Sequence, residues 1–141
     1  VRACKKSVDC VMNIRQIKET CIYMRDLESA RHFYHELLGL PIIHQVKDKH
    51  IFFRAGRSVL LCFHPDDSRI KISPPAHFSE GRYHFAFEIP GSEYEQHKEW
   101  IAQLGIQITD EVTWPNGNKS FYFEDPAGNV LEMVPEGVWD Y

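Results

Sequence analysis

Apolar and polar residues alternate in short runs along the chain, and two longer stretches instead repeat apolar residues at helical spacing. The alternating runs predict strands within 14–24 and at 41–46, 50–54, 58–64, 83–89, 106–109, 120–124 and 130–134. The helical spacing predicts one helix that Asp26 caps and Gly39 ends, and a second that the capping box Ser92–Glu95 opens and Gly105 ends. The chain is therefore expected to be an α+β protein.

The order of these elements occurs twice, because each half reads strand, helix, strand, strand, strand. In this internal repeat, Val59-Leu60-Leu61 corresponds to Val130-Leu131-Glu132, and Glu19 opens the first half where His84 opens the second. We therefore expect a first βαβββ module over 12–66, a linker over 67–81, a second module over 82–137 and a C-terminal tail over 138–141. Residues 1–11 carry no periodic pattern and are expected to be a tag remnant or an upstream extension.

The composition of the 141 residues narrows the possible partners. A net charge of −4 gives no basic footprint for nucleic acid, and no apolar run approaches the ~18 residues of a membrane span. The four cysteines include no C-x-x-C pair, and Cys21 and Cys62 lie in predicted strands as buried thiols. A reduced, cytoplasmic setting is the expectation that follows.

One carboxylate stands out in the second half. Asp125-Pro126-Ala127-Gly128 predicts a tight turn between two strands, and Glu132 interrupts the apolar strand that follows it. Leu131 and Met133 point to the opposite face, and a buried carboxylate is costly unless it is paired or bound to a metal. Glu132 is therefore the first candidate functional residue, and its repeat counterpart Leu61 shows that the scaffold does not require it.

Three motifs resemble the vicinal oxygen chelate superfamily, which includes glyoxalase I, fosfomycin-resistance thiol transferases, bleomycin-resistance proteins and extradiol dioxygenases. The motifs are Y-M-R-D-L-E-S-A-R-H-F-Y-H-E-L-L-G at 23–39, R-Y-H-F-A-F-E-I at 82–89 and S-F-Y-F-E-D-P-A-G-N-V-L-E at 120–132. The resemblance covers roughly 14–135. It implies two βαβββ modules that form a partly open mixed-strand barrel, the glyoxalase-like fold.

The resemblance also implies a metal site, because family members take ligands from the first strand of each half and the last strand of the second. Glu19, His84 and Glu132 match those positions, and Leu61 occupies the place of a fourth ligand. One imidazole and two carboxylates suit Mn²⁺, Fe²⁺, Ni²⁺ or Zn²⁺ without distinguishing them. Such an ion acts as a Lewis acid on a substrate with adjacent oxygens, with Glu132 and Glu19 as the catalytic carboxylates.

Two functions remain open. The first is a divalent-metal-dependent lyase, isomerase or thiol transferase acting on a small oxygen-rich molecule, and a dioxygenase is a less favoured variant. The second is a metal-free protein of the bleomycin-resistance type, which Glu19 in place of the family's more usual histidine favours. Fosfomycin modification is not favoured, because Val112 stands where a lysine is expected.

The remaining candidates are residues predicted to contact the ligand. Trp114, Asn116, Ser120, Tyr122 and Phe63 are expected to bind the substrate, and Tyr23 and Glu88 share faces with the predicted ligands. His44, His50, His77 and His97 show no ligand spacing with one another. By analogy with the family we expect a homodimer that pairs modules across subunits, so that Glu19 comes from a different chain than His84 and Glu132.

Overall fold

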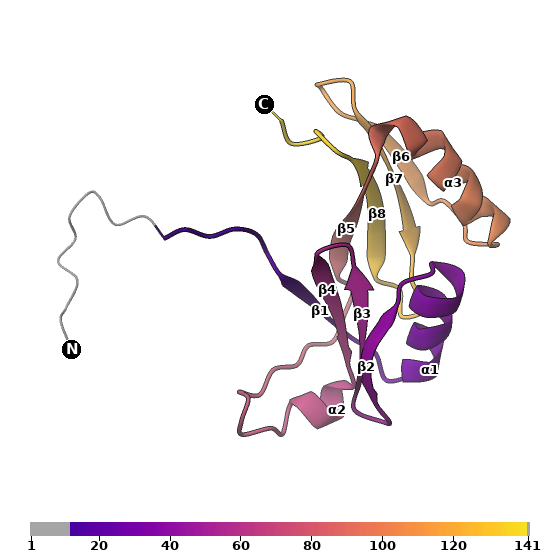
Figure 1. Ribbon diagram of the computed structural model, residues 1–141. Coiled ribbons are helices and arrows are strands. Elements are labelled where there is room, and N and C mark those ends of the chain that lie inside the picture. Colours follow the sequence, from indigo (N-terminus) through magenta and orange to yellow (C-terminus); the bar gives the residue numbers. More distant parts are fainter. Residues whose placement is uncertain (1–11, 141) are drawn as a thin grey trace.

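The computed structural model describes residues 12–140, so the predicted extension at 1–11 lies outside the described residues. Its strands form two separate sheets of four (Figure 1). The first sheet has the order β1-β4-β3-β2, and its strands are β1 (Glu19–Tyr23), β2 (Ile42–Val46), β3 (His50–Ala55) and β4 (Ser58–Phe63). The second has the order β5-β8-β7-β6, with strands β5 (His84–Ile89), β6 (Asp110–Thr113), β7 (Lys119–Glu124) and β8 (Val130–Pro135).

The two sheets share one topology. In each, the first strand pairs in parallel with the last, and the other neighbours are antiparallel. Figure 1 shows the helix of each half packed on the same side of its sheet, with neither sheet closed into a barrel. The predicted α+β fold of two βαβββ halves in a partly open arrangement is confirmed.

Five short helical elements complete the structure: α1 (Leu27–Ala30), the π-helix η1 (Arg31–Leu37), α2 (Pro65–Ser68), the 3₁₀ turn η2 (Gly91–Glu93) and α3 (Tyr94–Gln103). Asp26 caps α1 as predicted, because its carboxylate accepts a hydrogen bond of 3.0 Å from the Ser29 amide. The continuous α-helix expected before Gly39 instead widens into η1, where the Leu38 amide bonds to the Phe33 carbonyl. Side-chain periodicity does not reveal that change of hydrogen bonding.

Two local predictions are wrong. The capping box at Ser92–Glu95 does not form, because η2 occupies that stretch and α3 begins at Tyr94 without a side-chain cap. The strand expected at 106–109 begins instead at Asp110. Ile106 and Ile108 alternate with polar residues because they pack partly buried against the core, which gives a strand-like pattern to a loop.

One hydrophobic core joins the two halves through η1. Phe33 lies 6.4 Å from the Phe123 ring, and Tyr34 lies 6.4 Å from the Phe85 ring. The Tyr34 hydroxyl donates a hydrogen bond of 2.6 Å to Asp125, which sits in the predicted turn between β7 and β8. The first helix therefore holds the second sheet in place.

Each sheet turns its other face away from the helices, and we call these surfaces the first and second open faces. The first carries Glu19, Cys21, Tyr23, His44, His50, Phe52, Arg54, Val59, Leu61 and Phe63. The second carries His84, Ala86, Glu88, Asp110, Val112, Ser120, Tyr122, Glu124, Val130, Glu132 and Val134.

The open faces correct one prediction and explain the placement of the linker. Cys62 is buried as expected, but Cys21 is exposed because it lies on the first open face. The linker passes beside this face, and α2 begins it (Figure 1). Arg25 anchors the linker at both ends with ion pairs of 2.5 Å to Asp66 and Glu80. Within 12–140, no helix has the length and apolar character to cross a membrane.

Candidate metal site on the second open face

Strand register places the predicted ligands at equivalent points of the two sheets. His84 pairs with Val130, and the next position on the same face brings Ala86 opposite Glu132. In the first sheet, Glu19 pairs with Val59, and Cys21 lies opposite Leu61. Glu19 therefore occupies the place of His84 in the first sheet, and Leu61 the place of Glu132, as the sequence repeat indicates.

His84 and Glu132 meet on the second open face. The His84 Nε2 atom lies 3.2 Å from Glu132 Oε2, and the Glu132 side chain is 8% exposed against 51% for His84. The other ring nitrogen, Nδ1, lies 2.9 Å from the Val130 carbonyl oxygen. A carbonyl accepts only from a protonated nitrogen, so Nδ1 carries the proton in the neutral ring and Nε2 presents its lone pair to the carboxylate.

Two electron-rich atoms that face each other at this distance repel unless a cation lies between them. A proton on Nε2 or a metal ion bound by both groups removes the repulsion. A backbone carbonyl that fixes the ring through Nδ1 is the usual arrangement around metal-binding histidines. The pair is therefore a chemically suitable half of a divalent-metal site.

Tyr122 borders this pair on the open face. It lies directly opposite Glu132 in the β7–β8 pairing, and its ring is 6.0 Å from that of His84. Burial raises the pKa of Tyr122, and the Glu132 carboxylate raises it further against an opposing effect of Ser120. The phenol therefore stays protonated at neutral pH and can donate a hydrogen bond to a bound ligand.

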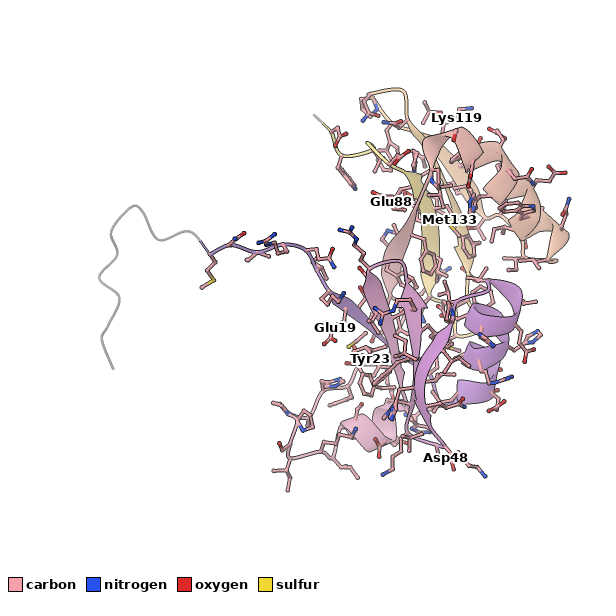
Figure 2. All side chains as sticks on the ribbon, viewed as in Figure 1. Glu19, Tyr23, Asp48, Glu88, Lys119 and Met133 are labelled. Carbon is pink, nitrogen blue, oxygen red and sulfur yellow. The ribbon has the colours of Figure 1, made fainter. Side chains whose placement is uncertain are left out.

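Glu19 does not join His84 and Glu132 within one chain. It is exposed on β1, in the half of the molecule that holds α1, whereas Glu88 marks β5 in the other half (Figure 2). Across residues 12–140, no three His, Cys, Asp or Glu side chains are grouped so that they could hold a metal ion. The described residues of one chain thus bring together two of the three predicted ligands, and a three-ligand site would need a donor beyond this pair.

The predicted substrate-binding residues fall on both sheets. Trp114, Ser120 and Tyr122 belong to the half that holds His84 and Glu132. Ser120 is buried and accepts a hydrogen bond of 2.9 Å from the Trp114 indole. The Asn116 side-chain amide donates a hydrogen bond of 3.0 Å to the Val138 carbonyl and thereby fixes the loop against the C-terminal turn. Phe63 belongs to the first open face, where it packs 5.2 Å from Phe52.

The structure brings together histidines that show no shared spacing in the sequence. The His44 Nδ1 atom lies 2.8 Å from His50 Nε2 across the β2–β3 hairpin, and the Tyr23 hydroxyl lies 2.7 Å from His77 Nδ1 in the linker. Burial, and next the neighbouring His44, lowers the pKa of His50. The hairpin could have predicted the first pair once its register was known, but no sequence signal predicts the second.

Cys21 lies between Glu19 and Tyr23 on the first open face. Burial raises the pKa of its thiol, and the neighbouring Glu19 carboxylate raises it further. The reactive form of cysteine is the thiolate, so this raised pKa argues against a nucleophilic role for Cys21.

A cavity of about 890 Å³ opens elsewhere, between the β3–β4 turn and α3. Leu37, Phe87, Trp100 and Leu104 contribute its apolar lining, whereas Glu19, His84 and Glu132 do not line it. Ala86, which lies opposite Glu132 in the β5–β8 pairing, also lines the cavity, so the cavity adjoins the second open face without including the His84–Glu132 pair.

Two four-stranded mixed sheets of repeated topology, with a histidine and a carboxylate paired on one open face, define a protein of the glyoxalase-like fold class. The sequence profile of the Glyoxalase/Bleomycin resistance protein/Dioxygenase superfamily matches residues 16–133, and the chain belongs to this superfamily.

The chain is similar to proteins that are named as enzymes. Glutathione transferase FosA of Serratia marcescens is 27% identical over 121 residues, which cover 85% of this chain and 80% of the relative. Metallothiol transferase FosB of Staphylococcus saprophyticus is 27% identical over 124 residues, with 85% and 76% covered. The crystal structure of lactoylglutathione lyase from Agrobacterium tumefaciens superposes with a TM-score of 0.88 at 32% identity, covering 92% of this chain and all of that one.

Proposed function

We propose that this protein is a divalent-metal-dependent enzyme, a lyase, isomerase or thiol transferase, that acts on a small molecule with adjacent oxygen atoms. The observation that carries the proposal is the His84–Glu132 pair, in which the Nε2 atom of His84 lies 3.2 Å from an oxygen of a carboxylate that is only 8% exposed. The relatives support the reaction class, since one is named a metallothiol transferase and two others carry glutathione in their names.

The metal would be held by Nε2 of His84 and the Glu132 carboxylate, with Glu19 of a second chain as the third ligand. Glu19 is exposed on the first open face and is thus accessible to another copy. When bound, the ion would act as a Lewis acid on the substrate oxygens. We propose that two copies pair the first open face of one with the second open face of the other.

The chain's own residues would then orient the substrate and handle protons. The Val130 carbonyl holds the His84 ring in the tautomer that leaves Nε2 free, and the Tyr122 phenol donates a hydrogen bond to a substrate oxygen. The Trp114 indole is committed to Ser120, so its ring forms a wall of the site. Glu132 or Glu19 would accept the proton that the reaction releases.

Metal binding tests the proposal directly. Tag-free protein stripped with a chelator is expected to take up one Mn²⁺ per chain, measured by elemental analysis and isothermal titration. His84→Ala and Glu132→Gln should each weaken uptake by more than the about 10–100-fold that loss of an outer hydrogen-bond partner costs. At 100 times the dissociation constant, bound Mn²⁺ should stabilise the wild type by about 2.7 kcal/mol.

His32→Ala is the matched control, because His32 and Glu36 form another His–Glu pair at 2.7 Å, exposed on η1. This variant should bind Mn²⁺ as the wild type does. If the wild type takes up no Mn²⁺, Fe²⁺, Ni²⁺ or Zn²⁺ and its melting temperature does not move with any of them, the proposal is wrong. The metal-free ligand-binding protein would then be the better account.

A further inference from the structure

The first open face contains an arginine that the site described above does not use. Arg54 lies on β3 and pairs with Val59, which in turn pairs with Glu19, so all three occupy one row across the sheet. Its side chain is only half-buried and alternates with the core residues Ile51 and Phe53. Sequence reasoning missed Arg54 because a single arginine in a strand reads as a solvated residue.

The guanidinium of Arg54 is unpaired. Among the residues that the structure describes, it makes no hydrogen bond, ion pair or ring contact, whereas its backbone amide bonds to the Pro41 carbonyl at 2.8 Å. Arginine carries five donors and is always charged, and its planar fork matches the geometry of a carboxylate or phosphate. The guanidinium of Arg54 is therefore free to bind an anion.

The charges of the two open faces show where that anion belongs. On the first, Glu19 is the one carboxylate among the strand residues of β1–β4, and it accompanies Arg54, His44 and His50. The second carries carboxylates at Glu88, Asp110, Glu124 and Glu132. The second face thus attracts a cation, while the Arg54 end of the first attracts an anion.

Strand spacing sets the separation between Glu19 and Arg54 on the first open face. Glu19 and Arg54 are two strands apart, so their Cα atoms are separated by about 10 Å, and the flexible arginine shortens that distance at its guanidinium. Phe52 lies two residues before Arg54 on the same face, in one row with Leu61 and Cys21, and supplies apolar surface next to the Arg54 row. A ligand with metal-chelating oxygens at one end and an anionic group a few bonds away matches this spacing.

We propose that Arg54 anchors a carboxylate or similar anionic group at the far end of the substrate, so that the substrate class is a chelating small molecule with a second, anionic end. This inference rests on the proposed function, because Glu19 marks the metal end of the row. Arg54 would hold that group through two parallel hydrogen bonds and would thereby select among chelating molecules.

The test compares two ligands that differ only at the far end. 2-Oxoadipate and 2-oxohexanoate share the chelating 2-oxo acid and the chain length, but the first ends in a carboxylate and the second in a methyl group. The dissociation constants of both are measured by isothermal titration on Mn²⁺-loaded full-length chain, with Mn²⁺ content determined on the same samples. Wild type is expected to prefer 2-oxoadipate about tenfold or more.

Arg54→Gln should abolish that preference while leaving Mn²⁺ content, circular dichroism and oligomer mass unchanged, and Arg54→Lys should keep only part of it. Arg57→Gln is the matched control, because Arg57 is exposed three residues further on, in the β3–β4 turn, and should keep the full preference. Equal binding of both ligands by wild type, or an Arg54→Gln variant that still prefers 2-oxoadipate, overturns the inference. So does an Arg54→Gln variant that changes oligomer mass, because Arg54 would then pair with a second copy.

Failure of the proposed function gives a different result. If wild type binds no Mn²⁺, the same two ligands are compared on metal-free protein at millimolar concentration by ligand-observed nuclear magnetic resonance. A preference for 2-oxoadipate that Arg54→Gln removes supports the anchor without the metal, and equal binding overturns it.

Discussion

Glu132 shows how far reasoning from single residues reaches in this chain. A carboxylate inside an apolar strand is visible in the sequence, and the resemblance to the superfamily implies His84 as its partner. The structure adds what the sequence does not contain, which is the 3.2 Å approach of the two side chains and the carbonyl that orients the ring. Cys21 shows a limit of such reasoning, because it was predicted to be buried and is exposed. Strand alternation separates the two faces of a sheet but does not tell which face other elements cover.

The buried contact between Tyr34 and Asp125 is a second residue-scale feature with a measurable effect. Asp125 is 5% exposed and accepts hydrogen bonds from the Tyr34 hydroxyl, the Asn129 side chain and two backbone amides. Burial raises the pKa of Tyr34 well above its usual range, and Asp125 raises it further, so the hydroxyl remains a donor at any working pH.

We expect Tyr34→Phe to lower the free energy of unfolding by about 1.5–3 kcal/mol, because it removes a buried hydrogen bond to a charged group. Chemical denaturation at neutral pH measures the loss. Tyr94→Phe is the control, since its hydroxyl bonds at 3.1 Å to Glu111, which also pairs with Lys98, and its loss should be smaller. A Tyr34→Phe loss no greater than that of Tyr94→Phe would show that the contact between the halves is not an important source of stability.

At the scale of elements, glycine predicted both helix ends, whereas of the two predicted polar caps Asp26 formed and the Ser92 capping box did not. Gly39 and Gly105 end their helices with φ of 79° and 78°, and the turn at Asp125–Gly128 closes with a 3.0 Å bond from the Gly128 amide to the Asp125 carbonyl. Those positions are dictated by backbone sterics that act locally. The capping box at Ser92 failed because a 3₁₀ turn satisfied the first amides instead, with the Glu93 amide bonded to the Pro90 carbonyl.

The turn that carries β8 toward the site gives an element-scale prediction. Gly128 has φ of +83° and an added Cβ would meet no atom within 4 Å, so Gly128→Ala tests backbone conformation alone. We expect a loss of about 1–2 kcal/mol in unfolding free energy, measured by thermal or chemical denaturation.

Gly91→Ala is the control for this change. Its Cβ would meet Pro135 at an ordinary 3.8 Å, and its φ lies outside the left-handed region, so little loss is expected. Equal effects of the two substitutions would mean that the left-handed turn does not determine the position of β8.

At the scale of the whole molecule, each half of the candidate site lies on a different sheet. Glu19 lies on the first sheet, and among residues 12–140 it is not grouped with His84 and Glu132. The sequence repeat predicted the two sheets and the equivalence of their positions, because register follows from alternation. It could not predict how the two faces meet, since that depends on contacts between surfaces that no local pattern encodes.

The proposed site therefore requires two chains, and a symmetric dimer would contain two such sites, each with Glu19 from one chain and His84 with Glu132 from the other. Glu19→Ala and His84→Ala would each empty both sites of their own dimers. In a mixed dimer, one site combines the intact Glu19 of one chain with the intact His84 and Glu132 of the other. The second site contains both substitutions and lacks Glu19 and His84. Light scattering first establishes the mass of each variant as that of a dimer.

The most direct measurement is the Mn²⁺ capacity of the two variants, alone and after joint unfolding and refolding in equal amounts. Each variant alone should bind no Mn²⁺ at a concentration that saturates the wild type, whereas the mixture should recover about a quarter of the wild-type capacity, because half of the dimers are mixed and carry one intact site. No recovery on mixing, while the wild type binds Mn²⁺ normally, would contradict a site shared between two chains.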